Sequence, residues 1–95
     1  MKVLWTETAI THLSAIHGYI ANSSATYAQR VVDRLTRRSQ QIADFPMSGR
    51  VVPEIDLPQI REVFEGPYRI IYVIKPDQID VLAVMHSAQQ MLWGQ

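Results

Sequence analysis

Three strand-like runs stand almost end to end in the second half of the chain, and they constrain its fold more than any other feature. They span residues 60–64, 68–75 and 79–86, and each is rich in Val, Ile, Tyr or Phe, which fit a pleated, half-buried surface. Gly66-Pro67 separates the first two runs, and a turn at Pro76-Asp77 separates the last two. A parallel return needs a crossover of about a dozen residues, so junctions this short allow only antiparallel neighbours. The stretch therefore predicts a β-meander, and the rest of the chain must cover one of its faces.

The first half of the chain predicts one strand and two helices. Residues 2–5 form an apolar run of strand length. Thr6 is suited to cap a helix, and apolar residues then recur at intervals of three and four up to Ile20. Ser24 is suited to cap a second helix, which we expect to end at Asp44 because Pro46 disfavours helical geometry in the residue before it. The short turn between the two helices predicts an antiparallel helical hairpin.

This order of elements predicts an α+β fold in a single domain over residues 1–95. It is a two-layer sandwich of an N-terminal strand, a helical hairpin and a three-stranded antiparallel meander (β-α-α-β-β-β). Both faces of the meander are mostly apolar, so we expect the helices to cover one face and a partner peptide the other. Residues 51–58 are expected to be extended and irregular, and residues 87–93 to add a last helical turn. Alternation along the third run places one set of side chains on a common face: Asp80, Leu82, Val84 and His86.

Composition excludes several classes of chemistry. The chain has no cysteine, which excludes disulfides, thiol catalysis and cysteine-based zinc sites. His12 and His17 lie five residues apart, which is not a same-face spacing on a helix, so neither a metal nor a cofactor is expected. No apolar run is long enough to cross a membrane and the first residues are not a signal peptide, so a cytoplasmic location is expected. Nine basic residues balance nine acidic ones, which disfavours a dominant nucleic-acid-binding surface.

Five motifs, in order along nearly the whole chain, carry a family resemblance. They are Trp5 with Ala9, Leu13, Ile16, Tyr19 and Ile20; Phe45-Pro46 with Gly49-Arg50 and Val52-Pro53-Glu54; Ile60-Arg61-Glu62; Tyr68 to Tyr72; and Val81 with Val84 and His86. In this order and spacing the chain resembles the RelE/ParE superfamily of bacterial toxins from type II toxin–antitoxin pairs. The resemblance implies the same fold, a cognate antitoxin as partner, and contact with operator DNA only indirectly, through that antitoxin.

The resemblance leaves two activities open, because one fold hosts both. RelE-like members cut messenger RNA on the ribosome without a metal, and ParE-like members inhibit DNA gyrase. RNA cleavage needs a base, a cation that stabilises the phosphorane and an acid for the leaving oxygen. Under that reading Arg69 would clamp the phosphate and His86 would be the acid, with support from Arg61, Glu54 and Tyr72. The structural alternative is that Arg69 pairs with Glu62 or Glu65 and that His86 ends its strand with a hydrogen bond.

A second set of residues suits binding. Four arginines recur at helical spacing on the predicted second helix, with Asp33 at their edge: Arg30, Arg34, Arg37 and Arg38. With Arg50 and Arg61 they are the candidate contacts for an antitoxin or a target, although the stripe is equally typical of a solvated helix face. We also expect Arg50 to anchor its loop to a carboxylate and Arg61 to pair locally with Glu62.

Taken together, the residues favour a ParE-like toxin that binds DNA gyrase. The net charge is zero, Lys2 and Lys75 are the only lysines, and Ser87 and Ala88 stand where a terminal tyrosine would follow the histidine. Each of these features disfavours cleavage of messenger RNA on the ribosome. A RelE-like endoribonuclease and an inactive relative that survives as an interaction module remain the alternatives.

Overall fold

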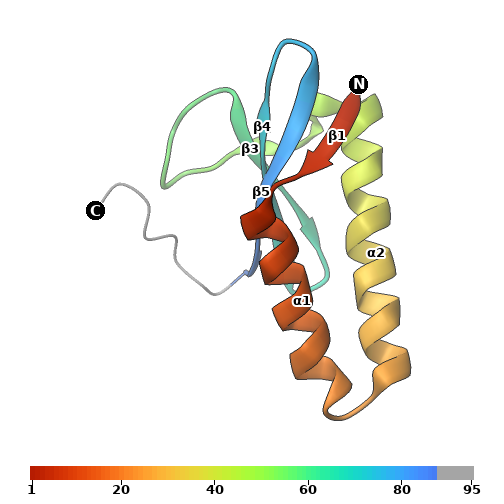
Figure 1. Ribbon diagram of the computed structural model, residues 1–95. Helices are drawn as coiled ribbons and strands as arrows, with labels where there is room; N and C mark the ends of the chain where they lie inside the picture. Colours follow the sequence, from red (N-terminus) through yellow and green to blue (C-terminus); the bar gives the residue numbers. More distant parts are fainter. Residues whose placement is uncertain (88–95) are drawn as a thin grey trace.

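The computed structural model describes residues 1–87, and its element order confirms the predicted α+β fold (Figure 1). The elements are β1 (Lys2–Trp5), α1 (Glu7–Ala21), α2 (Ala25–Asp44), a 3-10 turn η1 (Pro46–Ser48), β2 (Arg50–Val51), β3 (Ile60–Glu65), β4 (Tyr68–Ile74) and β5 (Gln78–His86). Except for Ser87, the final helical turn predicted over residues 87–93 lies outside the described residues. Neither helix within residues 1–87 is long and apolar enough to cross a membrane.

Both predicted caps start their helices. The Thr6 hydroxyl accepts a hydrogen bond from the backbone N–H of Ala9 at 3.2 Å and donates one to the carbonyl of Val81 at 2.8 Å, so the cap also ties α1 to β5. The Ser24 hydroxyl accepts from the backbone N–H of Tyr27 at 3.1 Å. Each side chain satisfies a donor that a helix N-terminus otherwise leaves unpaired, which typically stabilises a helix by about 1 kcal/mol. The second helix ends at Asp44, as predicted.

Within residues 1–87 the sheet has five strands, in the order β1-β5-β4-β3-β2. The meander of β3, β4 and β5 is antiparallel, as predicted. Two features go beyond the prediction. β1 pairs in parallel with β5, which the long connection through both helices permits. The edge strand β2 forms where the stretch expected to be irregular begins, from Arg50 just before it and Val51, and it places Arg50 opposite Glu62. The sheet is therefore mixed.

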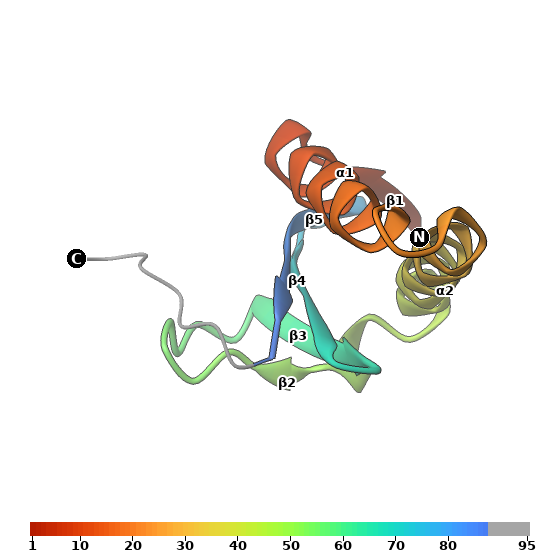
Figure 2. The ribbon, with the colours of Figure 1, turned by 90° about the horizontal axis from the view of Figure 1, so that it is seen from below.

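Each face of the sheet carries its own hydrophobic cluster, and the helices cover only one of them (Figure 2). The helix-side cluster joins Ala9, Leu35 and Ile42 from the helices to residues of β3, β4 and β5 such as Ile70. On the opposite face Val52, Ile71 and Ala83 are buried, with Ile55, Ile60, Leu82 and Met85 packed against them. The segment after β2 supplies part of the cover of this second face through Val52 and Ile55. The cover of this face by a partner peptide stays a prediction.

A β-bulge in β5 decides which side chains reach each face. Tyr72 lies opposite Val81 and Ile71 lies opposite Ala83, so one extra residue, Leu82, is inserted into β5. Beyond the bulge the pairing places Val84 opposite Ile70 on the helix side. The predicted common face for Asp80, Leu82, Val84 and His86 was therefore wrong, because strict alternation does not survive an inserted residue.

Candidate functional site

Four charged side chains meet on the sheet face opposite the helices. Glu62 is central: its Oε2 lies 2.6 Å from Nε of Arg50, and its Oε1 lies 2.9 Å from Nη1 of Arg69. Nη2 of Arg69 lies 2.7 Å from Oε2 of Glu54. The side chain of Glu62 is 0% exposed and that of Arg69 is 6% exposed. A buried carboxylate is tolerated only when charged partners replace its lost hydration, and here two guanidinium groups do so.

The ion network gives Arg69 a structural role. A hydrogen bond to Glu54, followed by the charges of Glu54 and Glu62, raises the pKa of Arg69 although burial acts in the opposite direction. The guanidinium is thus charged, buried and shared between two carboxylates. The predicted pairing of Arg69 with Glu62 is confirmed, as is the anchoring of Arg50 to a carboxylate.

The predicted local pair between Arg61 and Glu62 was wrong. Neighbouring residues of a strand point to opposite faces, and Glu62 points into the ion network while Arg61 lies opposite Tyr72. Arg61 instead donates from Nε to the carbonyl of Pro58 at 3.0 Å and from Nη1 to the carbonyl of Gly49 at 2.9 Å. Its guanidinium therefore ties the end of the loop before β3 to the residue that precedes β2.

Tyr72 is also committed to the fold. Its hydroxyl donates to the carbonyl of Pro46 at 2.7 Å and accepts from the N–H of Gly49 at 3.1 Å. A Cβ added at Gly49 would lie 2.5 Å from that hydroxyl and 2.6 Å from the carbonyl oxygen of Glu62, so this position requires glycine. Burial raises the pKa of the Tyr72 hydroxyl above its ordinary 10.0, against the lowering effects of the Gly49 hydrogen bond and of the charges of Arg61 and Arg38.

The residues of the RNA-cleavage reading do not converge on one place. Arg69 and Glu54 meet on the face opposite the helices. His86 lies opposite Tyr68 and its ring meets the Tyr68 ring edge-on, with centroids 6.0 Å apart, on the helix side of the sheet. Neighbouring residues in β4 point to opposite faces, so the cation and the acid of that reading project on opposite sides. Within residues 1–87, His, Asp and Glu side chains also form no group of three that could hold a metal ion.

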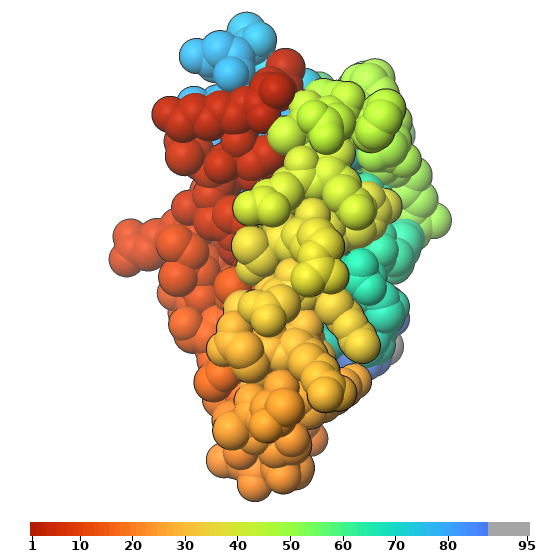
Figure 3. Space-filling view, turned by 90° about the vertical axis from the view of Figure 1, so that its right-hand side faces the viewer, coloured from red at the N-terminus to blue at the C-terminus, as the bar shows by residue number. Residues whose placement is uncertain are grey.

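The arginine stripe of α2 is confirmed as a surface feature. Arg30, Arg34 and Arg37 are exposed, and Arg38 is half-buried. Asp33 at the edge of the stripe accepts a hydrogen bond from Gln29 at 2.9 Å. In the part of the chain that the structure describes, no ion pair engages any of the four arginines. The outer side of α2, in yellow and orange, lies open along its length in Figure 3.

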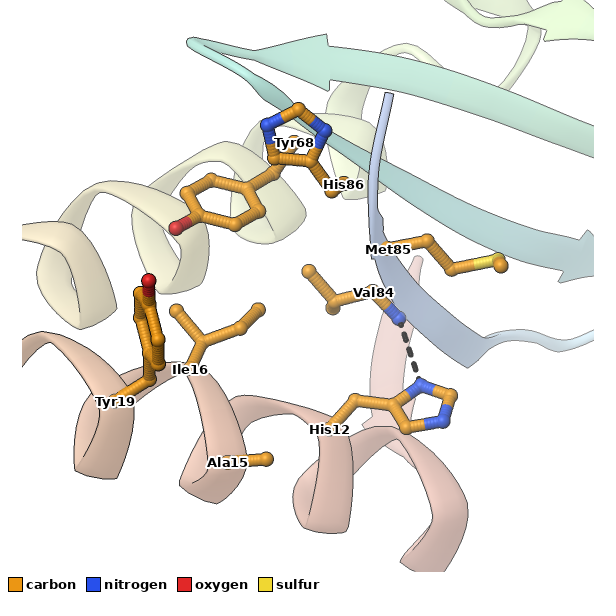
Figure 4. Close-up of a pocket in the computed structure, with 8 residues that line it drawn as sticks. All are labelled: His12, Ala15, Ile16, Tyr19, Tyr68, Val84, Met85 and His86. Atoms are coloured by element: carbon orange, nitrogen blue, oxygen red, sulfur yellow. Dashed lines mark hydrogen bonds between the residues drawn. The ribbon is translucent and has the colours of Figure 1, made fainter. Parts of the chain in front are cut away.

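A groove between α1 and the end of β5 has a volume of about 430 Å³ (Figure 4). Its lining is His12, Ala15, Ile16, Tyr19, Tyr68, Val84, Met85 and His86. Nδ1 of His12 accepts a hydrogen bond from the N–H of Val84 at 3.3 Å, which fastens α1 to β5 just past the bulge. Sequence reasoning missed this groove, because the bulge determines which residues of β5 face α1.

Comparison with known proteins supplies the family. The family described as "ParE toxin of type II toxin-antitoxin system, parDE" matches residues 3–91. "Toxin RelE2" of Caulobacter vibrioides is 32% identical over 89 residues, which cover 93% of this chain and 97% of the relative. "Putative toxin Y4kP" of Sinorhizobium fredii is 34% identical over 94 residues, 99% of this chain and 94% of the relative. The solved structure titled "Chromosomal ParDE TA system from P. aeruginosa" has the same fold, with a TM-score of 0.75, 20% identity, and coverage of 90% of this chain and 95% of that one.

Proposed function

The chain belongs to the ParE toxin family of type II toxin–antitoxin systems, and from that premise we propose that it arrests growth by binding DNA gyrase and that a cognate antitoxin neutralises it. Gyrase is the target of the ParE-like members that the sequence resembles. The observation that carries the choice of binding over RNA cleavage is the placement of Arg69 and His86 on opposite faces of the sheet.

The use of the charged residues supports the same choice. A phosphate clamp needs a guanidinium that is free to meet a ligand, whereas Arg69 is 5% exposed and shared between Glu62 and Glu54. Freeing it would leave the buried Glu62 with the exposed Arg50 alone of these two partners, and breaking a buried ion pair commonly costs about 3–5 kcal/mol. RNA cleavage through Arg69 would therefore work against the stability of the fold.

The binding residues are better sought on α2. Arg50 is exposed but held by Glu62, and Arg61 is bound to two backbone carbonyls. Arg30, Arg34 and Arg37 are exposed and have no such commitment within residues 1–87. We therefore assign contacts with the target or the antitoxin to the α2 stripe, with Arg38 at its margin, and contact with operator DNA only to a complex with the antitoxin.

One induction experiment separates this function from its rival. The rival is a RelE-like, ribosome-dependent mRNA endoribonuclease, which the name of the Caulobacter relative favours. After induction, we expect a DNA damage response, inhibition of supercoiling by purified gyrase, and no new cuts in messenger RNA by primer extension. Cut messages with unchanged supercoiling would establish the rival, and no growth inhibition by folded protein would establish an inactive relative.

The matched variants test the residues. Reversing charge at Arg34 and Arg37 together is expected to reduce gyrase inhibition, because both side chains are exposed on one helix face. Lys2→Glu is the control, since Lys2 is also exposed but lies on β1. If the wild-type protein, the Arg34 and Arg37 double variant and Lys2→Glu all inhibit gyrase equally, the α2 stripe is not part of the target interface.

A further inference from the structure

Three tyrosines gather at the closed end of the helical hairpin, near the turn that joins α1 to α2. Tyr19 lies near the end of α1, Tyr27 near the start of α2, and Tyr68 at the start of β4. The side chain of Tyr68 lines both the 430 Å³ groove and a smaller hollow of about 40 Å³ that Tyr27, Leu35 and Arg34 also line. Burial and, after it, the nearby Tyr27 and Tyr19 raise the pKa of Tyr68, so its hydroxyl stays protonated at neutral pH. The groove and the arginine stripe are thus joined through one residue.

We propose that a single segment of the antitoxin docks across this tyrosine surface, defined by Tyr19, Tyr27 and Tyr68. An aliphatic or aromatic side chain of the segment fills the groove between α1 and β5, and acidic residues further along it meet Arg34 and Arg30. The inference rests on the proposed function, because it takes the antitoxin as the partner.

The groove has the chemistry of an apolar anchor site. Ala15, Ile16 and Val84 supply aliphatic surface, and the hydroxyl ends of Tyr19 and Tyr68 approach each other at one end of the groove (Figure 4). Tyr19 is 81% exposed, so a large ring lies in water with little cover from residues 1–87. The lining includes imidazoles but neither Arg nor Lys, so a phosphate would find no fixed cation. Tyrosine-rich, partly apolar hollows are typical of the centres of protein interfaces.

Charge complementarity determines where the second half of the antitoxin segment lies. Arg34 lines the smaller hollow, and Arg30 is one helical turn before it on α2. Both are exposed and unengaged by ion pairs within residues 1–87. Glu65 is the single carboxylate in the lining of that hollow, and it repels an acidic segment from the β3 side. An acidic residue is therefore directed onto the α2 side, along the stripe.

The test uses the full chain and the purified product of the small reading frame beside its gene, in calorimetry. Tyr19→Ala is expected to weaken binding by about 30-fold or more, the usual threshold for a dominant interface residue. The fold should be unaffected because Tyr19 is so exposed. Ile10→Ala is the matched control: it removes an apolar side chain, 52% exposed, from the same helix outside the groove, and should change affinity by less than about threefold.

A second pair of measurements tests that one segment makes both contacts. Arg34→Ala is expected to weaken binding and to reduce its dependence on salt, because it removes a screened charge contact. If one ordered segment bridges groove and stripe, Tyr19→Ala combined with Arg34→Ala should lose less affinity than the product of the two single losses.

The outcomes separate this inference from the proposed function. If the wild-type protein binds the antitoxin and Tyr19→Ala and Arg34→Ala bind as tightly as the Ile10→Ala control, the docking surface is wrong while the partner stands. Failure of the wild-type protein to bind would overturn both. Loss of self-association in Tyr19→Ala with unchanged antitoxin affinity would assign the surface to a second copy of the chain. If Tyr19→Ala instead loses binding to a single-stranded RNA oligonucleotide with unchanged antitoxin affinity, the tyrosine surface is a nucleic-acid site. Each of these last two results would refute the proposal.

Discussion

Glu62→Gln is expected to destabilise the protein by about 3 kcal/mol, within the range of roughly 3–5 kcal/mol found when one partner of a buried ion pair is removed. The substitution keeps the shape of the side chain and removes one charge. Arg50, Arg69, Glu54 and Glu62 together carry zero net charge, and the variant leaves them with an excess positive charge. Against a typical total stability of about 5–15 kcal/mol, the loss is large.

The two arginines contribute unequally to this loss. Arg50 has a 58% exposed side chain, so solvent screens it and its pair contributes about 1 kcal/mol at most. Arg69 is 6% exposed, and with Glu62 changed it loses its fully buried carboxylate partner, while Glu54 has a side chain that is 34% exposed. Most of the cost therefore comes from the buried Arg69 guanidinium, which loses the charge of a buried partner.

Urea unfolding followed by circular dichroism at neutral pH measures this effect. Glu54→Gln is the matched control and should cost about 1 kcal/mol, because Glu54 is partly solvated. Replacing the pair together, as Glu62→Leu with Arg69→Met, should cost less than Glu62→Gln alone, since no buried charge is left uncompensated. A Glu62→Gln variant no less stable than Glu54→Gln would refute the reasoning, and a stable variant without toxicity would return Glu62 to a functional role.

Three further outcomes are expected. Gly49→Ala should lose about 1–3 kcal/mol in urea unfolding because its Cβ would meet the Tyr72 hydroxyl at 2.5 Å, whereas Gly18→Ala, with open space around it, should gain up to about 1 kcal/mol. The pKa of Tyr72 is raised in the folded protein, so its contribution to stability is complete below pH 10.0 and is lost as the pH rises through the folded pKa. The unfolding free energy of Tyr72→Phe should therefore fall less at alkaline pH than that of the wild-type protein. His86→Ala should leave growth inhibition intact in induced cells, since His86 and Arg69 lie on opposite faces; abolished inhibition by folded protein would favour the RNase reading.

Local chemistry made much of the fold predictable. Thr6 and Ser24 are caps whose hydroxyls satisfy helix donors whatever the tertiary context. Pro46 ends α2 at Asp44 because its ring disfavours helical geometry in the residue before it, Phe45. The meander followed from junctions too short for any return but an antiparallel one. Each of these predictions depends on residues within a few positions of one another.

The parts that sequence reasoning missed depend on distant residues. The bulge at Leu82 leaves no mark in the pattern of β5, which alternates acceptably in either register, yet it decides that Val84 faces α1 and Ala83 does not. The parallel pairing of β1 depends on where the long connection returns the chain. The intramolecular cover by Val52 and Ile55 came from a segment whose prolines suggested only irregularity. The ion network was partly predictable, because opposite charges on neighbouring strands attract, whereas the groove was not.

Net charge shows how composition alone misdirects a functional argument. Nine basic and nine acidic residues give zero, which disfavours a charged binding surface on average. In the folded protein Glu54 and Glu62 form ion pairs with Arg69 and Arg50. Oδ2 of Asp80 lies 2.6 Å from Nζ of Lys75. Three acidic side chains are thus paired on the sheet, while the α2 arginines form no ion pair within residues 1–87. A partner that binds these arginines must be acidic where it crosses α2 and apolar where it enters the groove. Added salt should therefore weaken binding only down to the affinity that the apolar contacts supply, because salt does not screen those contacts.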